Sequence, residues 1–175
     1  YNPIEHIKSR LKSAESIVMK LKKDGYEVTI ENMMECLSDI AGIRIICSFT
    51  SDIYQIAGMI AAQGDVTVLH VKDYIKNPKP NGYKSYHMVV TVPVYLTDGP
   101  VETKVEIQIR SVAMDFWASL EHKIAYKFEG NAPENLLKEL KACADMVDIL
   151  DAKMFSLNEA ITAFAREQKE RSEES

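Results

Sequence analysis

The segment Val101-Glu102-Thr103-Lys104-Val105-Glu106-Ile107-Gln108-Ile109-Arg110 alternates between two kinds of side chain along its whole length. Because neighbouring side chains of a β-strand point to opposite faces, this pattern predicts a strand with one core-facing side and one polar side. The polar side carries Glu102, Lys104, Glu106, Gln108 and Arg110. Taken alone, such a row is typical of a solvated sheet surface; a functional surface is the alternative.

The segments around this strand indicate an α+β fold rather than a doubly wound parallel sheet. Strands are predicted for residues 43–49, 66–71, 88–95 and 101–110, and the last two form an antiparallel hairpin. Helices are predicted for residues 51–62 and 111–128, and Thr29 is expected to cap a short helix that runs to about residue 37.

The start of the chain is also predicted to be helical. Asn2-Pro3-Ile4-Glu5 has the pattern of a capped helix start, and apolar residues follow at helical spacing as far as Leu21. A break near residues 10–13 would let Ser13 cap a second helix, and the N-terminus of that helix would be an anion site.

The end of the chain has a heptad pattern that is typical of a long helix. The apolar residues recur at alternating steps of four and three: Leu136, Leu140, Cys143, Val147, Leu150, Met154, Leu157, Ile161 and Phe164. We expect part of this stripe to contact another subunit; packing against helices of the same domain is the alternative. The sequence thus predicts a core over residues 1–130 and an oligomer-forming helical extension over residues 131–175.

The composition is ordinary for a globular protein, with 46% hydrophobic and 27% charged residues and a net charge of −5. No segment is long and apolar enough to span a membrane, and three scattered cysteines (Cys36, Cys47 and Cys143) indicate reduced core thiols in a cytoplasmic protein. The sequence contains no Walker loop, dinucleotide-binding glycine motif, zinc-ligand spacing or serine-hydrolase elbow, which argues against those enzyme classes.

Two groups of polar residues are candidates for chemistry at the ends of the predicted strands. Asp39 precedes a buried strand that contains Arg44, and Mg²⁺ prefers one or two carboxylates together with substrate phosphates, so Asp39 with Glu106 would suffice. An ion pair between Asp39 and Arg44 is the structural alternative. The basic segment 79–87 offers lysines for phosphate and Tyr83 as a stacking surface for a base; an exposed basic turn is the alternative.

Five blocks in this order resemble the synthetase domain of the RelA/SpoT family, and most closely its single-domain branch, the small alarmone synthetases. They are Arg10-Leu11-Lys12-Ser13 with Ser16 and Lys20, Asp39 to Arg44, Lys72 to Tyr83, His87, and Glu106 to Arg110. The resemblance covers about residues 3–165. It implies a mixed, mostly antiparallel five-stranded sheet flanked by helices, related to nucleotidyltransferases, with a long C-terminal helix.

The resemblance also implies a role for each matching residue. ATP would be bound by Arg10, Lys12, Ser16, Lys20 and Arg44, and the acceptor GTP or GDP by Lys72, Lys79, Asn81, Tyr83, His87 and Gln108. The catalytic residues would be Glu106, Asp39 and Arg44. Asp39 would ligate Mg²⁺, and Glu106 would be either the general base or a second metal ligand.

The activity that follows from the resemblance is transfer of pyrophosphate from ATP to the ribose 3′-OH of GTP or GDP, as in the stringent response. The alternatives are a toxin that modifies the 3′ end of tRNA and an RNA-binding regulatory module. A homotetramer is expected, with an allosteric alarmone or single-stranded RNA as a further ligand. His70 departs from the family pattern, which commonly has Arg or Glu there, so the choice between GDP and GTP stays open.

Overall fold

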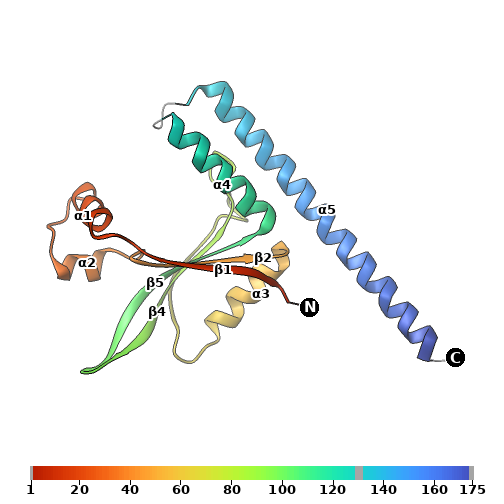
Figure 1. Ribbon diagram of the computed structural model, residues 1–175, viewed down its shortest axis with the longest axis horizontal. Helices are drawn as coiled ribbons and strands as arrows, with labels where there is room; N and C mark the ends of the chain where they lie inside the picture. Colours follow the sequence, from red (N-terminus) through yellow and green to blue (C-terminus); the bar gives the residue numbers. More distant parts are fainter. Residues whose placement is uncertain (1, 129–131, 174–175) are drawn as a thin grey trace. The chain divides into compact units, whose positions relative to one another are not determined.

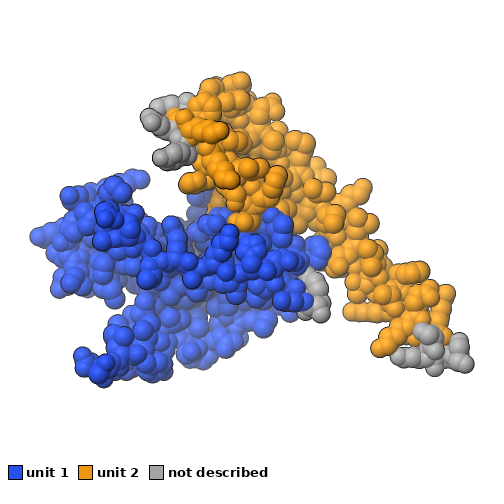
Figure 2. Space-filling view, in the orientation of Figure 1, with its two compact units in different colours: residues 1–79, 84–112 blue, residues 80–83, 113–175 orange. Residues whose placement is uncertain are grey.

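The computed structural model describes residues 2–128 and 132–173. The chain packs as two compact units, one of residues 1–79 and 84–112 and the other of residues 80–83 and 113–175 (Figure 2). The predicted division at residue 130 separates parts by function and stays a prediction. By packing, the chain divides near residue 112, and the short segment 80–83 joins the C-terminal helices.

The first unit is built on a five-stranded mixed sheet (Figure 1). The strands lie in the order β1-β2-β5-β4-β3, where β2 and β5 are parallel and the other neighbouring pairs are antiparallel. This arrangement confirms the predicted fold class. The strands are β1 (Ile4–Leu11), β2 (Ala41–Cys47), β3 (Thr67–Asp73), β4 (Tyr86–Leu96) and β5 (Gly99–Ser111).

The core lies on one face of this sheet. Val105, Ile107 and Ile109 of β5 are buried there, as their alternation predicts. Helix α3 (Thr50–Ala61) contacts β2 and β5 and buries Ile53 and Ile56. The opposite face of β5 therefore carries the polar residues.

Two short helices lie together where β1 ends and β2 begins (Figure 1). Helix α1 (Ala14–Lys23) is capped by Ser13, whose side chain accepts a hydrogen bond from the Ser16 backbone N–H. Helix α2 (Ile30–Cys36) is capped in the same way by Thr29. Both predicted caps are confirmed.

The predicted helix at the start of the chain is wrong, because residues 4–11 form the edge strand β1. Ile7 and Leu11 are 58% and 79% exposed, so their helical spacing does not mark a buried face. The strand is held by its backbone pairing with β2, a long-range interaction that side-chain periodicity does not report.

The second unit contains helices α4 (Val112–Lys127, of which residues 113–127 lie in this unit) and α5 (Glu134–Glu173). The indole N–H of Trp117 donates to the carbonyl of Leu140 at 2.9 Å, and Trp117, Ala118 and Ala144 form a small core. Val147 packs against this core, whereas the apolar residues that follow it in the heptad pattern are exposed: Leu150, Met154, Leu157, Ile161 and Phe164.

Each of the three cysteines has a free thiol, but only Cys47 is in the core. The prediction of core thiols is wrong for Cys36 and Cys143, which are exposed. On α5 the buried position is Ala144, one residue further along the chain than the heptad pattern indicated. No helix in the described part of the chain is long and apolar enough to cross a membrane.

Candidate active site

Two rows of side chains cross the polar face of the sheet. Residues that are paired in register on neighbouring strands project to the same face. One row is Arg10, Gly42, Glu106, Val89 and His70, and the next is Lys8, Arg44, Gln108, His87 and Lys72. The five strands thus gather residues predicted for both nucleotides on one surface.

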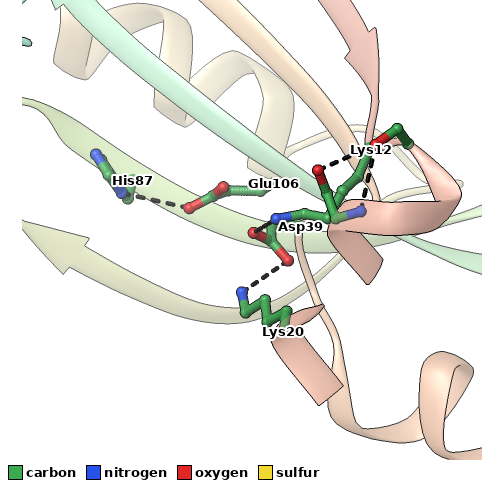
Figure 3. A network of polar contacts seen from close by, with 7 residues as sticks. Lys12, Lys20, Asp39, His87 and Glu106 are labelled. Atoms are coloured by element: carbon green, nitrogen blue, oxygen red, sulfur yellow. Dashed lines mark hydrogen bonds and ion pairs between the residues drawn. The ribbon is translucent and has the colours of Figure 1, made fainter. Parts of the chain in front are cut away.

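Glu106 of β5 lies near the centre of this surface and points towards His87 of β4 (Figure 3). Its Oε1 is 3.5 Å from Nδ1 of His87, and the side chains are 21% and 14% exposed, which does not fit a solvated sheet surface. The hydrogen bond from His87 lowers the pKa of Glu106 and outweighs burial, which acts in the opposite direction. Glu106 is therefore ionised near neutral pH and can accept a proton or bind a cation.

Asp39 lies just before β2, between two lysines from the N-terminal part of the chain (Figure 3). Its carboxylate oxygens are 2.7 Å from Nζ of Lys12 and 2.8 Å from Nζ of Lys20. Burial raises the pKa of Asp39, but the two ammonium groups lower it further, so the net change is downward. The ion pairs bring together three residues that the sequence assigned to ATP and metal binding.

Two cavities lie along the polar face, and Glu106 lines both of them. The first has a volume of about 230 Å³ and is lined by Lys8, Ser9, Arg10, Gly42, Ile43, Arg44, Glu106 and Gln108. The second has a volume of about 270 Å³ and is lined by Lys20, Ser38, Asp39, His70, Lys72, Tyr74, Lys79, His87, Val89 and Glu106. A group held in one cavity can thus react with a group held in the other beside a single carboxylate.

The second cavity has the residue types that bind phosphates together with a hard cation. Lys20, Lys72 and Lys79 supply positive charge, and Asp39 and Glu106 supply two carboxylates. In residues 2–128 and 132–173, no three His, Cys, Asp or Glu side chains are grouped as metal ligands. Two carboxylates completed by substrate phosphates are the usual environment of Mg²⁺, so the residues present fit that ion.

The loop after β3 is fixed by Asp73. Its carboxylate accepts hydrogen bonds from the backbone N–H groups of Ile75 and Lys76, each at 3.0 Å, and from the hydroxyl of Tyr54 on α3 at 3.1 Å. Further along the loop, Nζ of Lys79 lies 5.0 Å from the ring centroid of Tyr74. These contacts hold Lys79 and Tyr74 at the second cavity.

Asn81 and Tyr83 belong to the second unit. The side chain of Asn81 accepts from the Tyr83 backbone N–H at 3.0 Å and donates to Oε1 of Glu121 at 3.4 Å. Tyr83 packs against the Trp117 core. The role of both residues in acceptor binding stays a prediction.

The structure distributes some predicted residues differently from the sequence interpretation. Gln108 was predicted at the acceptor but lines the first cavity, beside Arg10 and Arg44. Lys12 and Ser16 line neither cavity: Lys12 reaches the site through Asp39, and Ser16 closes the first turn of α1 on Ser13.

Five polar residues that line the cavities had been given no site role from the sequence: Lys8, Ser9, Ser38, His70 and Tyr74. Lys8 belonged to the basic group of the N-terminal segment, but that segment was predicted to be helical; the period of a strand places Lys8 on the same face as Arg10. Tyr74 had a signal, since it stands inside one of the blocks that carry the family resemblance.

The chain is similar to proteins of one family along most of its length. Residues 9–131 match the family model described as "Region found in RelA / SpoT proteins". GTP pyrophosphokinase YwaC of Bacillus subtilis (strain 168) is 52% identical over 161 residues, which are 92% of this chain and 77% of that protein.

Solved structures agree with the sequence match. The crystal structure of small alarmone synthetase 2 from Bacillus subtilis superposes with a TM-score of 0.82 at 50% identity, covering 91% of this chain and 83% of that one. Small alarmone synthetase 1 from Bacillus subtilis, bound to its product pppGpp, gives a TM-score of 0.84 at 37% identity, covering 91% and 81%. The family model covers more than half of the chain, and these relatives match it over most of its length, so the chain belongs to the RelA/SpoT family.

Proposed function

We propose that this chain transfers the pyrophosphate group of ATP to the 3′-OH of GTP or GDP and releases AMP. The observation that carries this proposal is the position of Glu106, which lines two adjacent cavities whose other residues suit two different nucleotides. Two comparisons support the proposal: a relative is named GTP pyrophosphokinase, and the structure of another relative contains pppGpp.

The first cavity suits ATP. Arg10 and Arg44 present planar guanidinium groups, which stack on a purine and form paired hydrogen bonds with phosphate. Lys8 lies opposite Arg44 in the sheet and adds positive charge. Arg44 would therefore both bind ATP and assist catalysis, since positive charge near the transferred group stabilises the transition state.

Asp39, Lys12 and Lys20 form an ion-pair triad that would change partners when ATP binds. Here the two ammonium groups neutralise the carboxylate. Asp39 would hold Mg²⁺ together with substrate phosphates, and the bound ion would neutralise phosphate charge; Glu106 would be either a second ligand of the ion or the general base. Lys12 and Lys20 then turn to phosphate oxygens, with Ser16 nearby on α1. The triad keeps each charge paired in the absence of substrate.

The second cavity suits the acceptor nucleotide. Lys72, Lys79 and His87 line it and would hold the phosphates and ribose of the acceptor. Tyr83 would stack on guanine with Asn81 beside it, and Gln108, which lines the first cavity, would complete the predicted set. Glu106 accepts the proton of the 3′-OH as this oxygen attacks the β-phosphorus of ATP. The bond from the β-phosphorus to the oxygen that bridges to the α-phosphorus breaks, and AMP leaves with that oxygen.

The experiment that tests the proposal is incubation of the purified chain with ATP, Mg²⁺ and either GTP or GDP, followed by anion-exchange chromatography. A more anionic guanosine product with one equivalent of AMP is expected, and its yield ranks the two acceptors. If AMP were released only when tRNA is added, the chain would instead be a toxin that modifies the 3′ end of tRNA. If no AMP were released with any acceptor, the remaining alternative, an RNA-binding regulatory module, would be favoured.

We further propose that the chain acts in the cytoplasm as a homotetramer. The free thiols suit a reducing compartment, and the exposed apolar residues of α5 suit a contact with other copies of the chain. An allosteric alarmone or single-stranded RNA is a further ligand to test on the assembled protein. Chromatography of the purified chain with light scattering measures the number of copies directly.

A further inference from the structure

The segment 80–83 is a short piece of the basic loop that packs with α4 and α5. Lys79 before it and Lys84 after it belong to the first unit, yet Pro80 to Tyr83 belong to the second. This segment carries Asn81 and Tyr83, two residues assigned above to the acceptor nucleotide. What holds it therefore bears on how the acceptor binds.

The backbone of the segment presses against α5 at Gly82. This residue has φ of +93°, and a Cβ built on it would lie 2.6 Å from Cβ of Ala144 and 3.8 Å from Cα of Lys141. A side chain at position 82 is thus excluded both by the backbone conformation and by the helix. Ala144 in turn is only 5% exposed, so the contact is part of the core of this unit.

The two functional side chains of the segment are fixed by the same helices. Tyr83 packs against the core of Trp117, Ala118 and Ala144 and is half-buried, so part of its side chain stays accessible. Asn81 is held by its hydrogen bond to Glu121 of α4.

We propose that Glu121 and Ala144 are positioning residues for the acceptor nucleotide: they hold Asn81 and Tyr83 in place without touching the substrate. This inference rests on the proposed function. It assigns to α4 and α5 a part in acceptor affinity, separate from any role of α5 in assembly. ATP affinity does not depend on this contact.

Two pairs of variants test the proposal. Ala144→Gly removes the methyl group beneath Gly82, and Ala142→Gly is the matched control, since it has the same intrinsic helix penalty at an exposed position of the same helix. Glu121→Ala removes the acceptor for Asn81, whereas Glu121→Gln keeps a side-chain oxygen at that place.

The measurements are the Kd of GDP and of a non-hydrolysable ATP analogue by calorimetry, and KM and kcat for both substrates. For Ala144→Gly and Glu121→Ala we expect the Kd and KM of the acceptor to rise roughly two- to ten-fold, the range that one net hydrogen bond or a small packing defect supports. The values for ATP should stay within about twofold of wild type, as should all values for the two control variants.

Equal effects of Ala144→Gly and Ala142→Gly, or a parallel loss of ATP affinity, would overturn the inference, because a general weakening of the fold acts on both substrates. Wild-type protein that binds GDP but makes no product would overturn the proposed function, and the Kd ratios of the variants would still decide the inference. Wild-type protein that binds no guanine nucleotide would overturn both.

Discussion

Glu106 lines both cavities and is held by His87, which also lines the second cavity, and its carboxylate is the group on which the proposed chemistry depends. Glu106→Gln keeps the size and the hydrogen bond with His87 but cannot take up the proton of the 3′-OH. We expect kcat to fall about 10²–10⁴-fold, the usual contribution of a general base. AMP release under saturating ATP and GTP measures it.

The matched control for this variant is Glu102→Gln. Glu102 lies in the same polar row of β5, is exposed and lines neither cavity. It should keep full turnover, and urea unfolding should show that both variants are folded under the conditions of the assay. Turnover of Glu106→Gln within threefold of wild type would remove Glu106 from the reaction.

Among single residues, the sequence predicted roles for Asp39 and Glu106 but not the side chains that contact them. Asp39 and Glu106 were recognised from their place beside strands and from the family resemblance. That Lys12 and Lys20 both pair with Asp39 depends on how α1 folds back towards β2, a long-range arrangement. The placement of Gln108 in the first cavity likewise follows from the pairing of β5 with β2, which no local pattern encodes.

At the scale of elements, Tyr54 ties α3 to the end of β3 through Asp73. Burial, with help from the Asp73 carboxylate, raises the pKa of Tyr54 from 10.0 to about 12. The fold thus favours the neutral phenol. The neutral phenol therefore contributes fully to the free energy of unfolding below pH 10, and this contribution is lost as the pH rises from 10 to 12.

Tyr54→Phe removes that contribution, so it should lower the free energy of unfolding by about 1–2 kcal/mol at pH 8, the size of a hydrogen bond to a charged group at a partly exposed site. The difference from wild type should shrink at pH 11. Urea unfolding at both pH values measures it, with Tyr95→Phe at the exposed tip of the β4–β5 hairpin as the control. A difference that grows with pH would contradict the assignment.

The elements themselves were predicted where local patterns and burial agree. The alternation of β5, the apolar run of β2 and the caps Ser13 and Thr29 are local signals, and each is confirmed. Strand β1 has no such signal, because an edge strand with exposed side chains on both sides leaves the spacing of its apolar residues unconstrained. Its identity is decided by β2, far along the chain.

At the scale of the whole molecule, the question is what covers the second half of α5. The side chains at heptad spacing there are between 49% and 67% exposed: Leu150, Met154, Leu157, Ile161 and Phe164. Such a stripe is costly to leave in water. A contact with α5 of another copy would bury it by the packing that heptads favour.

Leu157→Glu combined with Ile161→Glu places two charges in the middle of that stripe. We expect the wild-type chain to sediment as an oligomer of the 19.8 kDa subunit and the double variant as a monomer, since like charges in an apolar contact cost more than the contact gains. Ala152→Glu, an exposed position on another side of α5, is the control and should stay oligomeric. The double variant should keep its far-UV helix signal, because these side chains make no core contact within the subunit. If the double variant remained oligomeric, the subunits would associate through a different surface.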